Sequence, residues 1–197
     1  DVDLVVNETF QSAFGYSGQK CSACSRLYLP EHMLGNFIAG IRKKIISINI
    51  EEYGVINKDK FEFVFNTIRH VRQSKYSKSR ILLGGITDDS VSYYIEPIVY
   101  LSETNENPLL SQELFAPLLG VRVYSGNNRN MIQECALTSD YALTGSIFSE
   151  NEKWLNNTLQ IFEETAGNLY INKKSTGAIV GQQPFGGFKL SGTNDKA

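Results

Sequence analysis

The chain has 197 residues, of which 42% are apolar and 20% charged, and its formal net charge is −2 at pH 7. This composition is typical of a globular protein, and the length suits one sizeable domain with its own core. The near-neutral charge gives no electrostatic reason to expect nucleic acid or a membrane as partner, and no apolar run is long enough to span a bilayer. Three cysteines are too few, and odd in number, for a secreted disulfide scaffold.

Apolar residues recur at helical spacing in several segments along the chain. A helix is expected over residues 4–14, where it leads into the first two cysteines. Residues 69–80 are the most basic stretch, which we interpret as the solvated end of a helix and its exit loop. Cys135 lies on a predicted apolar helical face and is expected to pack in the core. The further predicted helices cover residues 34–48, 61–71, 131–136 and 154–162.

Short β-branched or aromatic runs lie between these helices and are separated by glycine-rich breaks. Strands that alternate with helices predict an α/β domain, with a mainly parallel twisted sheet and helices on both faces. Residues 1–197 are expected to form one domain that closes with a glycine-rich tail from Ser175. Because the chain begins at Asp1 and not at Met, we expect it to be a piece of a longer protein. The predicted strands cover residues 27–29, 81–83, 94–95, 121–124, 145–148 and 169–171.

Two cysteines, Cys21 and Cys24, form a C-x-x-C within the stretch YSGQKCSACSR, residues 16–26. A structural zinc site needs four ligands, and the other candidates, Cys135, His32 and His70, are scattered, so no metal is expected. A thioredoxin-like dithiol follows a strand and opens a helix. Here the order is reversed, since a helix precedes the cysteines and a strand follows them. Neither zinc nor a redox dithiol is favoured.

The third interpretation is a single nucleophilic thiolate on a loop between the helix and the strand. Gly15 and Gly18 allow such a loop to expose a side chain and its backbone amide. Lys20 next to Cys21 favours the thiolate form, although an adjacent lysine is common by chance. A buried, inert thiol remains the ordinary alternative for an isolated cysteine.

The tail STGAIVGQQPFGGFKLSG, residues 175–192, is rich in glycine but matches neither G-x-G-x-x-G nor the P-loop pattern. Its backbone must make tight turns or approach another group closely. Two interpretations stay open at this point. The tail is either a folded surface loop, or its exposed backbone N–H groups form a nest for an anion.

Three segments, in the same order, resemble motifs of the aldehyde dehydrogenase family. FGYSGQKCSACSR is similar to the active-site signature, SQELFAPLLGV to the E-x-F-G-P element, and GNLYINKKSTGAIVGQQPFGGFKLSGTNDK to the closing loop. The resemblance runs from Asp1 to Ala197. These motifs are most similar to those of the branch that oxidises glutamate γ-semialdehyde to glutamate in proline degradation. The semialdehyde is in equilibrium with 1-pyrroline-5-carboxylate.

This resemblance implies a role for each of several residues. Cys21 is the expected catalytic nucleophile, which attacks the aldehyde and passes through a thiohemiacetal and a thioester. NAD is the implied cofactor, with Glu113 on the nicotinamide ribose hydroxyls and Phe115 packed beside that end. Backbone amides of Gly177 and Ala178 are expected to bind the carboxylate of the substrate. Two further substrate contacts are expected from the Ser22 hydroxyl and the Phe185 ring.

The resemblance also implies what lies elsewhere. The NAD-binding domain and the glutamate that activates water precede these residues in the family, so the fragment alone is expected to be inactive. The full-length protein is expected to be a homo-oligomer, in the mitochondrial matrix if the source is eukaryotic. Ala116 stands where the family usually has glycine, and a methyl group there is expected to shift the loop or weaken cofactor binding. The alternatives are a different aldehyde substrate, or an isolated domain without activity.

Overall fold

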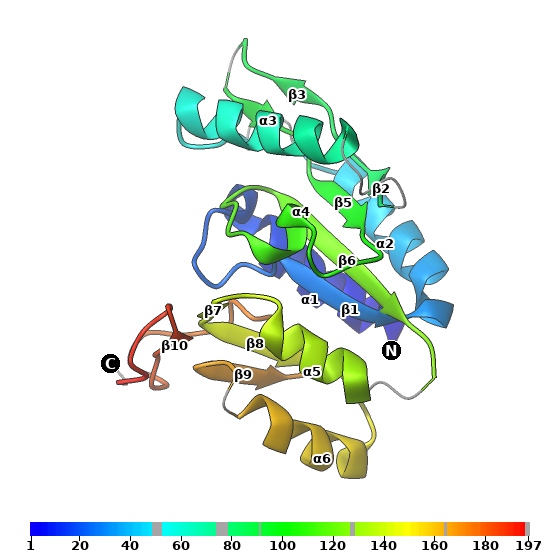
Figure 1. Cartoon of the computed structure of the whole chain (residues 1–197), viewed down its shortest axis with the longest axis vertical. Coiled ribbons are helices and arrows are strands. Elements are labelled where there is room, and N and C mark those ends of the chain that lie inside the picture. Colours follow the sequence, from blue (N-terminus) through cyan, green and yellow to red (C-terminus); the bar gives the residue numbers. More distant parts are fainter. Residues whose placement is uncertain (49–52, 74–78, 91, 127–128, 164, 196–197) are drawn as a thin grey trace. The chain divides into compact units, whose positions relative to one another are not determined.

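The computed structural model describes residues 1–48, 53–73, 79–90, 92–126, 129–163 and 165–195. Its contacts divide the chain into two compact units, Asp1–Ser125 and Gly126–Ala197. Both units contain helices and strands (Figure 1). That residues 1–197 act as one catalytic domain stays a prediction.

The first unit contains a four-stranded sheet with the order β1-β6-β5-β2. β6 pairs in parallel with both β1 and β5, whereas β2 pairs antiparallel with β5, so the predicted mainly parallel sheet is confirmed. A separate two-stranded antiparallel sheet joins β3 and β4. In chain order the elements are α1 Val2–Phe14, η1 Gly15–Gly18, β1 Arg26–Pro30, η2 Glu31–Met33, α2 Leu34–Ile46, α3 Lys58–Gln73, β2 Arg80–Leu83, β3 Thr87–Asp88, β4 Tyr94–Ile95, β5 Ile98–Leu101, α4 Pro108–Ser111 and β6 Leu118–Tyr124.

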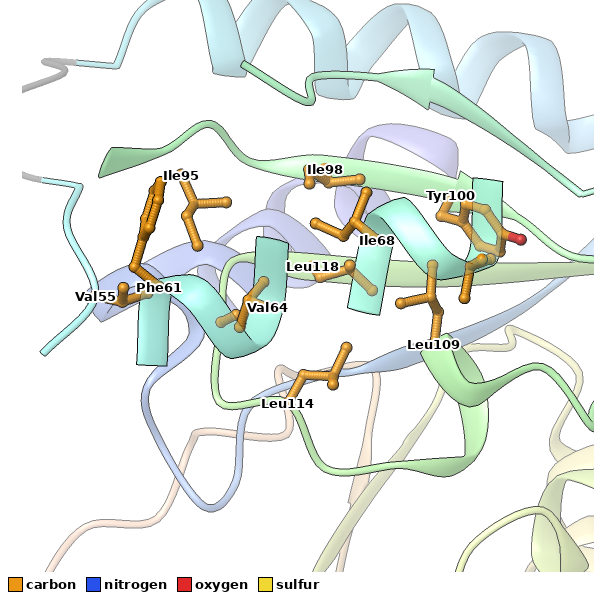
Figure 2. Packing of buried hydrophobic residues seen from close by; sticks show 12 residues of the cluster. Val55, Phe61, Val64, Ile68, Ile95, Ile98, Tyr100, Leu109, Leu114 and Leu118 are labelled. Carbon is orange, nitrogen blue, oxygen red and sulfur yellow. The ribbon is translucent and has the colours of Figure 1, made fainter. Parts of the chain in front are cut away.

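One face of this sheet is covered by α3. Phe61, Val64 and Ile68 of α3 pack with Ile98 of β5 and Leu118 of β6 in a single buried cluster (Figure 2). The spacing of these α3 residues is the helical period that predicted the element, because residues three or four apart share one face. The helix therefore forms where its apolar stripe meets the sheet.

The other face of the sheet is covered from the N-terminal part of the chain. Val99 and Leu119 follow Ile98 and Leu118 and point to the opposite face, since successive strand side chains alternate. Both are fully buried, and α1 contacts β6 while α2 contacts β2. Helices thus lie on both faces, as predicted.

The second unit has two short pairs of strands. β8 and β9 pair in parallel, and β7 and β10 pair antiparallel. The long side chain of Lys189 donates from Nζ to the carbonyl oxygens of Ala136 and Ser139, at 2.8 and 2.7 Å, and so satisfies carbonyl groups at the end of α5. The elements are α5 Arg129–Leu137, β7 Tyr141–Ala142, β8 Thr144–Ile147, α6 Glu152–Phe162, β9 Asn168–Ile171 and β10 Phe188–Lys189.

Some expectations from the sequence need correction. Cys135 is only half-buried, not part of a closed core. Phe65 is one of the apolar residues at helical spacing in the predicted helix 61–71, but its side chain is 41% exposed and stacks on Phe61, so it lies outside the buried face of α3. The predicted helix at 34–48 ends at Ile46. The basic stretch 69–80 is helical up to Gln73. Ser79 is half-buried and Arg80 is exposed, and residues 74–78 lie outside the described residues.

Within the described part of the chain, no helix combines the length and the apolar character needed to cross a membrane.

Candidate active site

The loop between α1 and β1 carries the C-x-x-C. The Ala23 N–H donates to the Lys20 carbonyl oxygen at 3.0 Å, so Cys21 and Ser22 occupy the two central positions of a tight turn. Cys21 is exposed, whereas Cys24 is half-buried and its thiol donates to the Arg26 carbonyl oxygen at 3.3 Å. The two thiols therefore have different environments, and only Cys21 has the access that a nucleophile needs.

The backbone just before this turn is strained. Tyr16, Ser17 and Gly18 have φ values of 62°, 54° and 67°, all in the left-handed region. For a residue with a Cβ this conformation costs roughly 1–2 kcal/mol. Gly18 also has no room for a side chain, because a Cβ there would lie 2.7 Å from the carbonyl carbon of Ala116 and closer still to its oxygen. The loop before Cys21 is thus packed directly on the segment that follows Glu113.

That segment, Glu113–Pro117, leads from α4 into β6. Glu113 is exposed and Phe115 is half-buried. Phe115 has a left-handed φ of 47°, and its ring centroid lies 6.0 Å from the Lys60 ammonium. Two motifs therefore lie side by side in the first unit: the loop with the predicted nucleophile and the segment predicted to contact the cofactor.

Ala116 was expected to disturb this segment, because the family usually has glycine there. Its φ lies outside the left-handed region, so its backbone conformation does not require glycine. The residue is buried, with 6% exposure, and its carbonyl oxygen accepts a 2.7 Å hydrogen bond from the Leu118 N–H at the start of β6. The extra methyl group is accommodated without strain in the backbone at this position.

Sequence reasoning missed Gln19, which lies between the strained residues and Cys21. Its Nε2 donates to the Gly54 carbonyl oxygen at 3.1 Å, and its Oε1 accepts from the Ile56 N–H at 2.9 Å. The only available signal was its place in the G-Q-x-C part of the matched signature. Nothing in the sequence indicates a partner more than thirty residues away.

The remaining predicted site residues lie in the second unit, in the loop Ser175–Gly187 after β9. Gly177 and Phe185 are half-buried, and Ala178 is exposed. A Cβ on Gly177 would lie 3.4 Å from the Tyr170 ring, so this glycine packs against the end of β9.

A second residue that the sequence did not reveal holds this loop. The side chain of Asn168 donates to the Pro184 carbonyl oxygen at 2.8 Å and accepts from the Gly186 N–H at 3.0 Å. These two groups flank Phe185 on its two sides. Asn168 therefore determines the backbone conformation at the residue expected to contact the aliphatic part of a substrate.

A further hydrogen bond joins the loop to β9. Gln183 donates from Nε2 to the Tyr170 hydroxyl at 3.0 Å. Burial raises the pKa of Tyr170 above its ordinary value, and the hydrogen bond from Gln183 acts in the opposite direction because it stabilises the phenolate.

No group of three or more His, Cys, Asp or Glu side chains that could hold a metal ion occurs among the residues the structure describes. The arrangement instead offers one accessible thiol, an exposed carboxylate at Glu113 and a half-buried ring at Phe115. An accessible cysteine can act as a covalent nucleophile. An exposed carboxylate can accept hydrogen bonds from hydroxyl groups of a ligand.

The chain belongs to the aldehyde dehydrogenase family, because the sequence profile described as "Aldehyde dehydrogenase family" matches residues 1–197. Delta-1-pyrroline-5-carboxylate dehydrogenase from Homo sapiens mitochondria is 40% identical over 206 residues, and the match covers 100% of this chain and 36% of that protein. The Dictyostelium discoideum mitochondrial enzyme of the same name is 39% identical, with 100% and 37% covered.

Solved structures agree with these relatives. The Mycobacterium tuberculosis delta-pyrroline-5-carboxylate dehydrogenase has a TM-score of 0.88 at 30% identity and covers 100% of this chain and 38% of its own. A Thermus 1-pyrroline-5-carboxylate dehydrogenase with bound NAD has a TM-score of 0.83 at 31% identity, with the same coverage. The α/β fold predicted from the sequence is therefore confirmed. The chain spans little more than a third of the length of these relatives.

Proposed function

We propose that this chain is the nucleophile-bearing part of an NAD-dependent dehydrogenase that oxidises glutamate γ-semialdehyde to glutamate. The observation that carries the proposal is the exposed Cys21 at the centre of a tight turn, packed through Gly18 on the segment that begins with Glu113. The relatives at about 40% identity are named for this reaction.

In the proposed reaction, the thiolate of Cys21 attacks the aldehyde carbon and forms a thiohemiacetal. The developing oxyanion accepts a hydrogen bond from the backbone N–H of Cys21. When the carbonyl re-forms as a thioester, a hydride leaves the former aldehyde carbon; a bound NAD would supply the hydride acceptor. Water then hydrolyses the thioester, which releases the carboxylate product and restores the thiol. Cys24 takes no part in these steps.

The residues present suit one end of the cofactor. The exposed Glu113 carboxylate can accept hydrogen bonds from the nicotinamide ribose hydroxyls, and the half-buried Phe115 ring offers an apolar face beside them. The rest of a dinucleotide would need contacts beyond these residues. We therefore expect the 197 residues alone not to sustain turnover, and the longer natural protein to do so.

The choice of substrate is assigned to a carboxylate-binding set. Gly177 and Ala178 would offer backbone N–H groups, Ser22 a hydroxyl, and Phe185 an apolar contact. Amide nests of this kind bind anions without a full counter-charge. In the same proposal, the whole protein is a homo-oligomer, and in a eukaryote it resides in the mitochondrial matrix, in keeping with the relatives named as mitochondrial.

The proposal is tested with the full-length protein, wild type and two serine variants. We expect NADH production from glutamate γ-semialdehyde with kcat/KM at least about tenfold above that for propanal, since losing a charged anchor costs a kcal/mol or more. Cys21→Ser should lower kcat by about 10³-fold or more, because the nucleophile is lost. Cys24→Ser should stay within about threefold of the wild type.

Faster oxidation of propanal would instead indicate another aldehyde substrate. Full activity of Cys21→Ser would reject the nucleophile, and no activity of the wild-type protein would favour a non-catalytic module.

A further inference from the structure

The side chain of Gln19 is engaged at both ends of its amide group. Nε2 donates to the carbonyl oxygen of Gly54 at 3.1 Å, and Oε1 accepts from the N–H of Ile56 at 2.9 Å. These two backbone groups lie on either side of Val55. The side-chain amide thus binds the segment Gly54–Ile56 as a neighbouring backbone would, with one donor and one acceptor matched.

The segment that Gln19 binds is itself held in the core. The Val55 N–H donates to the Tyr93 carbonyl oxygen at 3.2 Å, and the Val55 side chain is buried with 5% exposure beside Phe61. Gly54 forms an antiparallel bridge with Tyr94 in β4. Gln19 therefore connects the Cys21 loop to a segment that is held by backbone hydrogen bonds and by the buried Val55 side chain.

The loop itself needs such a connection. Tyr16 and Ser17 are left-handed although both carry a Cβ, and this conformation persists only where surrounding contacts enforce it. Gly18 supplies one such contact through its packing on Ala116. Gln19 supplies the next one, only two residues before Cys21, which is about 7 Å of extended chain.

We propose that Gln19 is a positioning residue for the reaction: by joining the Cys21 loop to Gly54–Ile56, it sets the direction from which the thiol meets the aldehyde. This inference rests on the proposed function of Cys21. Gln19 does not itself touch the reacting atoms. Misplacing a nucleophile by about 1 Å can cost about 10²-fold in rate, so the effect appears in the chemical step and not in the intrinsic reactivity of the thiol.

The connection can be tested independently of activity. In the full-length protein, Gln19→Met keeps the length of the side chain but removes its hydrogen bonds to Gly54 and Ile56, and also the 3.4 Å hydrogen bond to the Tyr16 carbonyl oxygen. Hydrogen exchange at single-amide resolution should then be about tenfold faster at Ile56, whose acceptor is lost. Exchange at Val55 should not change, because its acceptor is Tyr93. Gln160→Met, an exposed position on α6, is the matched control and should leave both amides unchanged.

The positioning role is tested by two rates. In Gln19→Met, we expect the pre-steady-state burst of NADH to fall at least about tenfold. Alkylation of Cys21 by iodoacetamide should stay within about twofold of the wild type, because the thiol remains exposed. A merely structural defect would instead lower the burst only in step with the thermal midpoint.

A conservative variant adds a pH signature. The Glu side chain in Gln19→Glu can accept from the Ile56 N–H at any pH, but it can donate to the Gly54 carbonyl oxygen only when its carboxyl group is protonated. The burst rate of Gln19→Glu relative to the wild type should therefore rise as the pH falls, whereas the same ratio for Gln19→Met should stay flat. An unchanged burst in Gln19→Met, while the wild type is active, would overturn the inference and leave the proposed function standing. If the wild type is inactive, the proposed function fails, and unchanged Ile56 exchange in Gln19→Met would reject the connection itself.

Discussion

The Cys21 loop of the first unit and the Ser175–Gly187 loop of the second are both held by a side-chain amide, but they differ in where the strain lies. The first has left-handed residues with side chains, Tyr16 and Ser17. In the second, the only left-handed residue is Gly181, where the conformation carries no Cβ penalty.

The two loops also differ in the exposure of their residues. Before Cys21, Gly18 packs on the backbone of Ala116 and Ser17 is buried with 3% exposure, although the Tyr16 side chain is 78% exposed. The second loop is held at its base by Asn168, while Ile179 and Val180 near its tip are 54% and 103% exposed. The comparison teaches that the first loop is built for one geometry, as the proposed nucleophile requires. The second is held at its base by Asn168 and by the Gln183–Tyr170 hydrogen bond, while its tip is exposed.

The largest expected effect is the loss of stability when one glycine in each loop is replaced by alanine. Gly18→Ala should destabilise the protein by about 2 kcal/mol or more, because a left-handed alanine would also collide with the Ala116 carbonyl. Gly181→Ala shares the left-handed φ, 79°, but nothing lies within 4 Å of its Cβ, so about 1 kcal/mol is expected. Thermal midpoints of the two full-length variants provide the measurement, and equal losses would mean that the first loop is not packed as described.

The second effect concerns substrate binding by the second loop. Asn168→Ala removes two hydrogen bonds that flank Phe185, at about 1 kcal/mol each. We expect KM for glutamate γ-semialdehyde to rise about five- to tenfold, with little change in KM for NAD. The thermal midpoint should fall by only a few degrees, in keeping with the loss of two hydrogen bonds.

Asn157→Ala, at an exposed position of α6, is the matched control and should leave KM unchanged. If Asn168→Ala instead reduced the burst of NADH and left KM alone, the two loops would not have the separate roles assigned to them.

The smallest effect is a shift in the pKa of a tyrosine. Gln183→Met should raise the pKa of Tyr170 further, because the donor that stabilises the phenolate is lost. Titration of tyrosinate absorbance reports the change, and Tyr94, whose pKa is raised chiefly by burial, is the internal control.

The sign for stability follows from linkage. A raised folded-state pKa contributes stability that is fully present below the ordinary tyrosine pKa of about 10. This stability is lost as the pH rises through the folded-state pKa. The loss of stability in Gln183→Met relative to the wild type should therefore increase in the alkaline range. A lowered Tyr170 pKa in this variant would contradict the conclusion that the hydrogen bond from Gln183 stabilises the phenolate.

Much of the fold was predictable because the long elements have a strong period. The apolar stripe of α3 and the order of helices and strands indicated the α/β sheet correctly. The prediction missed β5, Ile98–Leu101, which follows β4 after only Glu96 and Pro97. Pro97 lies between β4 and β5, and those two strands belong to different sheets. Two-residue strands such as β3 carry too little pattern to be recognised.

The site was predictable only in part, and for a different reason. Cys21 and Glu113 were found through motifs, and Cys21 is as exposed as that role requires. Gln19 and Asn168 were not found, because an amide side chain that binds distant backbone leaves no local pattern. The roles of all these residues stay predictions.

The central claim is tested most directly by competitive alkylation of the three cysteines in the full-length protein. With less than one equivalent of iodoacetamide, peptide mass spectrometry should find Cys21 modified first, in proportion to the loss of NADH production, and saturating aldehyde should protect it. Modification of Cys24 or Cys135 at an equal rate, or full activity with Cys21 completely alkylated, would contradict the account.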